Sequence, residues 1–362
     1  MSDPTANNEE TKVTVGLDLG DRHIQVCLVD EAGEVIEEAR LATRPQALRR
    51  RFCGADQLRI VLEAGTHSPW VSRLLAELGH EVIVANPRKL RLIYTNDSKS
   101  DRVDAEYLAR VGRLDPTLLA PLRHRGAETQ VDLALLRSRN ALVRARTRLI
   151  SHARGTTKSL GARLPACSSE SFAAKAGACL PDELRPALDP VLAVIAGLDA
   201  QISALDARIA EMARQRYPET ALLTQVPGVG TLTAMVYVLT LEDPQRFPKS
   251  RSVGSYLGLR PRQRDSGSAQ PQLRITKAGD EHLRWLLVGA AHYILGPFGP
   301  DTDLRRWGLA LAAQGGRAAK KRAAVAVARK LSVLLLRLWT TGEVYEPLRN
   351  ARLHGELLAA PS

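Results

Sequence analysis

The stretch Val13–Asp30, VTVGLDLGDRHIQVCLVD, decides the fold class expected for this 362-residue chain. Apolar residues run before and after a short polar turn, which predicts a strand, a tight turn and a returning strand. Asp18 lies inside the first strand, where a carboxylate costs free energy unless it is paired, hydrogen-bonded or bound to a cation. The pattern indicates a functional acid, although a satisfied structural aspartate at a strand end would look the same.

The residues after the hairpin alternate strands and helices. We expect a third strand at 33–42, a helix at 44–53, a buried strand at 58–62, a helix at 71–78 and a strand at 81–85. Three strands followed by helix, strand, helix, strand is the order of the α/β fold of the ribonuclease H type. This first domain is expected to span residues 11–121. Ligands of such sheets gather at the carboxyl ends of the strands.

Three further acids follow in positions that could converge on Asp18. Glu63 comes directly after a buried strand, and its alternative interpretation is an acid at the start of the next helix. Asp101 and Asp104 begin an expected helix and project from one face, about 5–6 Å apart at Cβ. Helix capping explains one such acid but not a second on the same face. Four carboxylates could hold a hard divalent cation, Mg²⁺ or Mn²⁺.

Composition points to a polyanionic partner. The net charge is +12 and the pI about 9.9, with 4% aromatic residues, which favours nucleic acid over a membrane. Four cysteines without a C-x-x-C pair suggest neither a zinc site nor a disulfide framework. The apolar stretches 232–241 and 285–298 are too short or too interrupted to span a bilayer, and no nucleotide or zinc motif is recognisable. We expect a soluble cytoplasmic protein that does not contact a membrane.

Residues 122–216 are expected to form a basic helix and a coiled coil. Residues 122–163 contain ten Lys or Arg against two acids, which favours phosphate contacts over a merely solvated face. Apolar residues from Leu188 to Met212 then alternate steps of three and four, which is a heptad seam. A hairpin within one subunit would explain the seam, but a coiled coil between subunits is at least as well supported, so we expect a homo-oligomer, a dimer or a tetramer. The candidate phosphate-binding residues of the basic helix are Arg137, Arg139, Arg144, Arg146 and Arg148.

Residues 217–345 are expected to form a third, mainly helical domain. The turn Pro227-Gly228-Val229-Gly230 resembles a helix-hairpin-helix motif, whose backbone N–H groups bind phosphate, although an ordinary glycine turn is equally well supported. Residues 246–284 hold nine basic residues and three acids, and residues 304–338 hold nine basic residues and no acid. The candidate nucleic-acid-binding residues are Gly228, Gly230, Arg260, Arg262, Arg264, Arg274, Lys277, Lys320, Lys321 and Arg322.

The order Asp, Glu, Asp-x-x-Asp-Ala, within GLDLGDRH, LEAG and KSDRVDA, resembles the DEDD transposases of bacterial insertion sequences and the related Piv/MooV DNA invertases. The resemblance spans about residues 13–338, including the Pro-Gly turn and a Ser-Gly loop. It implies a RuvC-like catalytic domain, in which Asp18, Glu63, Asp101 and Asp104 match the four acids and hold the metal.

The same resemblance implies the reaction and the partners. DNA strands would be cut and rejoined through a phosphoserine intermediate, guided by a structured bridge RNA that pairs with target and donor DNA. Ser266 matches the nucleophile and would act with the acids of another subunit of a tetramer, at the bacterial nucleoid. The chain has Asp265-Ser266-Gly267 where the family often has Ser-Ser-Gly, so Ser268 stays an alternative.

Two other functions remain as alternatives. A Mg²⁺-dependent structure-specific nuclease, similar to Holliday-junction resolvases, would use water and would not need the serine loop. A non-catalytic nucleic-acid-binding protein would not need all four acids. Both patterns are present, which favours the transposase.

Overall fold

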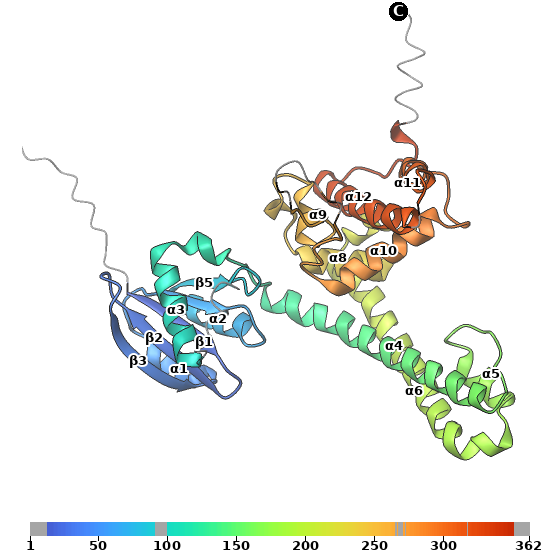
Figure 1. Ribbon diagram of the computed structural model, residues 1–362, viewed down its shortest axis with the longest axis horizontal. Coiled ribbons are helices and arrows are strands. Elements are labelled where there is room, and N and C mark those ends of the chain that lie inside the picture. The colour runs from blue at the N-terminus through green and yellow to red at the C-terminus, as the bar shows by residue number, and fades with distance from the viewer. Residues whose placement is uncertain are drawn as a thin grey trace, which may run out of the picture. The chain divides into compact units, whose positions relative to one another are not determined.

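The computed structural model describes residues 13–90, 100–264, 266, 271, 273–316 and 318–350 (Figure 1). The chain divides into two compact units, residues 1–127 and 128–362, and each is treated by itself below. The first unit has the strands β1 Thr14–Leu19, β2 His23–Val29, β3 Val35–Ala42, β4 Arg59–Glu63 and β5 Glu81–Ala85, and the helices α1 Pro45–Phe52, α2 Ser68–Glu77 and α3 Asp101–Leu114. The second has α4 Ala127–Ser159, α5 Phe172–Ala178, α6 Arg185–Arg216, α7 Thr220–Leu223, α8 Thr231–Leu241, α9 Ser252–Tyr256, α10 Glu281–Leu295, α11 Asp303–Ala313 and α12 Ala319–Thr341.

A five-stranded sheet forms the centre of the first unit, in the order β3-β2-β1-β4-β5. Strands β1, β2 and β3 pair antiparallel, whereas β4 is parallel to β1 and β5 is parallel to β4. The five strands and the two helices between them lie where the sequence predicts them, except that α2 begins at Ser68 rather than at residue 71. The expected mixed α/β sheet is therefore confirmed.

Helices cover both faces of this sheet (Figure 1). Val15 of β1 and Leu62 of β4 belong to the core shared with α1 and α2. Because side chains alternate along a strand, the residues next to them on each strand face the opposite side of the sheet. Helix α3 packs on that second face, where a side chain at Gly16 would collide with the Ala105 carbonyl oxygen and one at Gly112 with Val61. The two glycines therefore allow α3 to lie directly against β1 and β4.

The second unit begins with a long helical hairpin, in which α4 and α6 run antiparallel side by side (Figure 1). Arg139 of α4 binds Asp206 of α6, and seven residues further along α4 Arg146 binds Asp199, so the contacts advance along one helix as they retreat along the other. The heptad positions Ile195 and Ile202 are buried, and Ile195 packs with residues of α4 and α5. The seam is thus occupied inside this chain, and the prediction that it joins subunits has no support in the structure.

The helices that follow α6 share one core with α8. All residues from Thr233 to Leu241 are buried, and they share a core with α10, α12 and the ends of the hairpin near Leu136 and Ile209. A helix that is apolar on every side is expected in the middle of a helical domain. The two domains that the sequence predicts at 122–216 and 217–345 therefore belong to one compact unit.

The segment 182–216, which contains α6, is long and apolar enough in composition to cross a membrane. This segment was not among the apolar stretches 232–241 and 285–298 noted in the sequence, because its apolar residues are spaced at heptad intervals. One such helix is weak evidence for a membrane span, since helices in the core of soluble proteins pass the same test. Here Asp199 and Asp206 within this segment form ion pairs with arginines of α4, which makes α6 one half of the hairpin.

Candidate active site and nucleic-acid interface

Asp18 and Glu63 lie side by side at the carboxyl ends of two neighbouring parallel strands. Leu17 of β1 pairs with Leu62 of β4, so Asp18 and Glu63 are the next positions along the two strands, about 4.8 Å apart at Cα. By alternation both side chains belong to the face that α3 covers, and both are half-buried. Both also take part in polar interactions within the protein. The register of β1 and β4 therefore puts these two acids at neighbouring positions.

Helix α3 brings Asp101 and Asp104 to the same edge of the sheet. Near its other end, Arg113 donates to the carbonyl oxygen of Asp30, which follows β2 at the edge where β1 begins. Because α3 with 14 residues and β1 with six are each about 20 Å long, the start of α3 lies toward the end of β1. Ser100 caps the helix by accepting from the Val103 N–H. Asp101 is exposed and Asp104 half-buried in the first turns.

Two histidines that the sequence analysis missed lie near Glu63. His67 Nε2 is 3.5 Å from the Asp21 carboxylate. This contact joins the loop after β4 to the turn between β1 and β2. The buried Ser68 hydroxyl accepts from the Gly65 N–H and donates to the Gly65 carbonyl, so His124 Nε2, at 2.9 Å, is the donor to it. Burial, with Arg73 and Arg125 nearby, lowers the pKa of His124, so its ring is neutral. These bonds fix the loop that follows Glu63.

The donor set fits a hard cation, because Asp18, Glu63, Asp101 and Asp104 offer only carboxylate oxygens. Among the described residues, no three His, Cys, Asp or Glu side chains come close enough to form a metal cluster as they stand. The backbone nevertheless puts two of the acids on adjacent strands and two at the start of the helix over them.

Ser266 belongs to the second unit and is exposed. Before and after it, residues 258–264 and 273–277 form a two-stranded arm, called the serine ribbon below. Pro261 pairs antiparallel with Ile275, and the Arg262 N–H donates to the Arg274 carbonyl oxygen at 3.0 Å. The alternative nucleophile Ser268 lies outside the described residues. The structure therefore gives the Ser-Gly loop a defined support, which the sequence analysis described only as a loop between helices.

A buried arginine that the sequence analysis did not single out holds the base of the serine ribbon. The Arg284 guanidinium donates to the carbonyl oxygens of Leu257, at 3.1 Å, and of Ala278, at 2.6 Å. These two residues lie where the ribbon leaves α9 and where it returns toward α10. Arg284, counted in the sequence only as one of nine basic residues, is thus structural.

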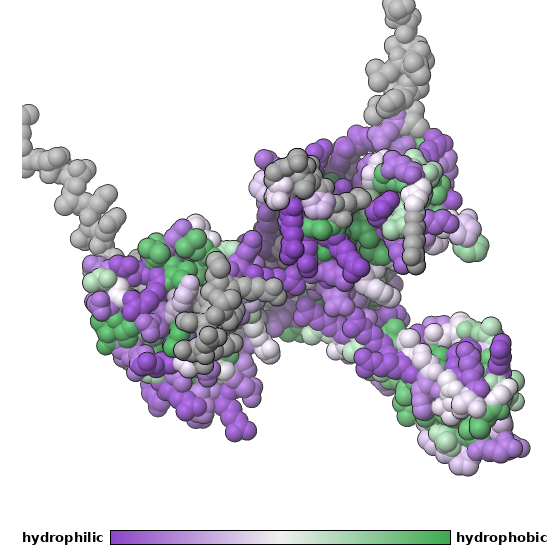
Figure 2. Space-filling view, viewed as in Figure 1, coloured by the Kyte–Doolittle hydropathy of each residue, from purple (hydrophilic) through white to green (hydrophobic). Residues whose placement is uncertain are grey.

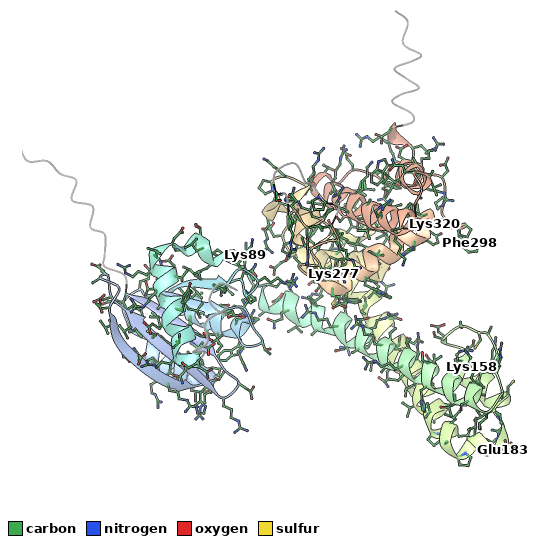
Figure 3. The ribbon with its side chains drawn as sticks, viewed as in Figure 1. Lys89, Lys158, Glu183, Lys277, Phe298 and Lys320 are labelled. Atoms are coloured by element: carbon green, nitrogen blue, oxygen red, sulfur yellow. The ribbon has the colours of Figure 1, made fainter. Side chains whose placement is uncertain are left out.

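The predicted basic residues of the ribbon and of α12 are all exposed. On the ribbon these are Arg260, Arg262, Arg264, Arg274 and Lys277, and at the start of α12 they are Lys320, Lys321 and Arg322. Figure 3 labels Lys277 and Lys320 in this helical part of the chain. Arg262 lies directly opposite Arg274 across the ribbon, a pairing of like charges that is unfavourable unless an anion lies between them.

The Pro-Gly turn joins α7 to α8 as predicted, but α7 has only four residues. Gly228 has φ +85° and lies against Tyr293 and Ala290 of α10, so close packing explains this glycine without a ligand. Gly230 is exposed and precedes α8, whose first turn lacks a side-chain cap. Only Gly230 keeps the position that a phosphate-binding turn requires.

The five arginines predicted on α4 divide into two groups. Arg146 is buried and binds Asp199 and Glu170, so the prediction that it contacts phosphate is wrong in this structure. Arg139 makes two hydrogen bonds to Asp206 and belongs to the hairpin as well. The other three are exposed, with long contacts from Arg137 to Asp280 and from Arg144 to Glu281. The sequence could not show this division, because the partners of Arg139 and Arg146 lie on α6, far along the chain.

Comparison with known proteins assigns the family. A family model described as transposase and named for the DEDD transposases of IS110 matches residues 15–160, which include all four acids. A second, described as transposase of the IS116/IS110/IS902 family, matches residues 220–302, which include Ser266. Together the two matches span more than half of the chain.

Relatives of similar length match along most of this chain. A probable family 20 transposase of Pseudomonas aeruginosa is 28% identical over 340 residues, which is 92% of this chain and 98% of that protein. The transposase for insertion sequence element IS1111A of Coxiella burnetii is 27% identical over 91% of this chain and 90% of that protein. The transposase for IS1328 of Yersinia enterocolitica is 29% identical over 76% of this chain and 82% of that protein. This chain is therefore an insertion-sequence transposase of the IS110/IS116 family.

Proposed function

We propose that this transposase cuts and rejoins DNA strands through a phosphoserine intermediate formed by Ser266. Asp18, Glu63, Asp101 and Asp104 would hold Mg²⁺ or Mn²⁺ for this reaction. The observation that carries the proposal is the pairing of β1 with β4, which makes Asp18 and Glu63 neighbours at the edge where α3 begins with the other two acids. Two such strand ends and one helix start supply four oxygen-donor side chains to one region of the sheet.

When bound, the cation would lower the pKa of an attacking hydroxyl and stabilise charge on the leaving oxygen. The protein's own residues prepare that reaction. The two strands hold their carboxylates at neighbouring positions, and the hydrogen-bonded loop from Gly65 to Ser68 keeps the residues after Glu63 in place. A rigid backbone of this kind fixes the donor atoms before substrate binds.

In the proposed reaction the Ser266 oxygen forms a bond to a phosphorus of DNA. The bond from that phosphorus to a deoxyribose oxygen breaks, the serine proton passes to a carboxylate or to solvent, and the leaving oxygen gains a proton. A deoxyribose hydroxyl of a new strand then attacks the same phosphorus and releases the serine. One phosphodiester is exchanged for another, so no nucleotide cofactor is needed, in agreement with a sequence that has no recognisable nucleotide motif.

We further propose that a bridge RNA selects the DNA sites, by pairing with target and donor DNA, and that the protein works as a homo-oligomer at the bacterial nucleoid. The exposed arginines of α4, the serine ribbon and the start of α12 support a nucleic-acid partner. Within the oligomer Ser266 would act with the acids of another subunit. This part of the proposal concerns how the sites are chosen and can fail without the chemistry failing.

A trapped adduct tests the serine. Purified protein, with the RNA that copurifies with it, is incubated with Mg²⁺ and a DNA substrate that carries a nick just beyond the cleavage position, so that the released end diffuses away. Wild-type protein and Ser268→Ala should give a covalent protein–DNA product on a denaturing gel, and Ser266→Ala should give none while it still binds DNA. Peptide mapping then locates the phosphate. An adduct on Ser268 would move the nucleophile to that residue.

A second candidate function is a metal-dependent nuclease, which the four carboxylates alone would support, because hydrolysis needs only the metal-activated water. The same gel separates the two functions. Cleaved DNA without an adduct, in wild type and in both serine variants, would show that water attacks.

A further inference from the structure

A cavity of about 810 Å³ lies between the serine ribbon and α12. One wall is the ribbon, with Pro261, Arg274 and Ile275, and the other is formed by α12 and the end of α11. This volume is in the range of sites that enclose a small organic molecule. It is larger than a single phosphate group needs.

The lining carries five cations and no carboxylate among the described residues: Arg274, Lys277, Lys321, Arg322 and Arg329. Arg329 was not among the predicted nucleic-acid-binding residues. Its stem lies over Gly254 of α9, where any side chain would crowd it. Positive side chains gathered around one cavity attract an anionic ligand.

The rest of the lining is mostly apolar. Leu259, Leu311, Val325 and Ala326 contribute aliphatic surface between the charged side chains. Figure 2 shows apolar patches between hydrophilic side chains on the helical part of the chain. A phosphate alone gains nothing from such a floor, whereas a nucleobase removed from its stack buries its flat faces there.

We propose that this cavity binds one unstacked nucleotide of a DNA strand, with the base on the apolar floor and the flanking phosphates among the five cations. The inference rests on the proposed function, because it takes this strand to be the one that Ser266 attacks. Arg274 connects the two sites, since it lies opposite Arg262 on the serine ribbon and also lines the cavity. Binding one nucleotide here would anchor the strand next to the serine loop.

The smallest probe of this cavity is thymidine 3′,5′-bisphosphate, which has one nucleoside and a phosphate on each side. Its affinity for the full-length protein is measured by calorimetry and compared with that of pyrophosphate, which lacks the nucleoside. Wild type should bind the bisphosphate at least about tenfold more tightly than pyrophosphate, as expected for an apolar contact the size of a base.

Three variants on one helix locate the site. Arg329→Ala should weaken binding of both probes about tenfold, by the loss of a charge-assisted contact. Ala326→Leu, which fills the floor, should weaken only the bisphosphate. Lys330→Ala is the matched control, because the adjacent Lys330 lies over the Trp307 ring at 4.3 Å and does not line the cavity. It should leave both affinities unchanged.

Equal binding of the two probes, or no effect of Ala326→Leu on the bisphosphate, would overturn the nucleotide assignment. An equal loss in Lys330→Ala and Arg329→Ala would also overturn it, since binding would then reflect general charge. These measurements need neither metal nor strand cleavage, so their failure is separate from that of the serine adduct. If the adduct forms and the bisphosphate does not bind, only the cavity assignment falls.

Discussion

Asp18 lies near the carboxyl end of β1, which pairs with β2 on one side and with β4 on the other. The neighbouring position on the parallel strand β4 is a second acid, Glu63. A structural role would require a permanent hydrogen-bond donor or cationic partner for each acid, whereas a metal site requires that the acids remain able to meet one cation. The two roles differ in what happens when the charge is removed and the shape is kept.

We expect the rate of strand exchange to fall by at least about 100-fold in each of the variants Asp18→Asn, Glu63→Gln, Asp101→Asn and Asp104→Asn. Loss of a residue that only hydrogen-bonds to a metal ligand already costs up to about 100-fold, and loss of the ligand itself should cost at least as much. Folding and DNA affinity should change little. Glu77→Gln is the control, because Glu77 lies exposed on α2 next to Arg49. Exchange is measured with Mg²⁺ as recombined DNA. Normal exchange in any two of the four variants would show that the metal site is assigned to the wrong residues.

His124 should make the first unit sensitive to acid. Its pKa is lowered from 6.5, mainly by burial and further by Arg73 and Arg125, so the folded protein binds this proton less readily than the unfolded chain does. The unfolded state then holds more protons below about pH 6.5, and stability is lost as the pH falls from there through the folded-state pKa.

The unfolding free energy in urea, compared between pH 8 and pH 5.5, measures this effect. His124→Gln, which can still donate to Ser68, should show a smaller loss on acidification than wild type. His282 in the second unit has a pKa lowered by its burial as well, so part of the pH dependence should persist in the variant. An unchanged pH dependence in His124→Gln would exclude His124 as a source.

Among the elements, the hairpin of α4 and α6 depends on its ion pairs unequally. Arg146 is 7% exposed and meets Asp199 at 2.5 Å, whereas the pair of Arg139 and Asp206 is more open to water. Removing one partner of a buried pair leaves the other charge uncompensated, which costs about 3 kcal/mol or more, whereas an exposed pair contributes about 1 kcal/mol or less.

Asp199→Asn should therefore lower the unfolding free energy of the second unit by several times as much as Asp206→Asn does. Thermal unfolding followed by circular dichroism measures both, and the two variants change the charge of the same helix by the same amount. Equal effects would mean that Arg146 is held by Glu170 instead.

The strands of the first unit could be predicted to within about two residues, because most of them are apolar runs with clear breaks. The heptad pattern of α6 predicted a helix with a narrow apolar seam. It could not predict what packs against that seam, because a helix of the same chain and a helix of a second subunit require the same heptad pattern. Ile195→Lys, which the seam hypothesis would use to split an oligomer, should instead disrupt the hairpin core around Phe172.

At the site, Asp18 and Glu63 could be singled out because each interrupts or follows an apolar run, and Asp101 and Asp104 because they share one face at the start of a helix. Neither the buried Arg284 nor Arg329 could be, because their roles come from residues far along the chain. Arg284 binds the carbonyl of Leu257, and Arg329 reaches its cavity only because α9 has a glycine beneath it. A count of basic residues cannot distinguish an arginine that holds carbonyl groups from one that faces DNA.

For the molecule as a whole, a net charge of +12 makes nucleic-acid affinity dependent on salt. Arg148 is exposed on α4, and Arg148→Ala should lower the slope of log affinity against log salt by about one if it contacts a phosphate. Arg214→Ala is a control, since Arg214 is exposed and pairs with Glu211 near the end of α6. The slope is measured by fluorescence anisotropy with a labelled RNA. Equal slopes for wild type and Arg148→Ala would remove Arg148 from the interface.

The guided mechanism makes a prediction about the assembled particle that no single variant can test. Protein purified from bacteria that carry the complete element should contain one discrete RNA, recovered by sequencing, and its removal by ribonuclease should abolish recombination. Adding that RNA back should restore activity, and adding a version with altered pairing segments should redirect recombination to the matching DNA, because base pairing rather than side chains would read the sequence. Recombination that continues unchanged without RNA would exclude the guide. The adduct on Ser266 would still test the serine chemistry independently. The exposed arginines would then bind DNA rather than RNA.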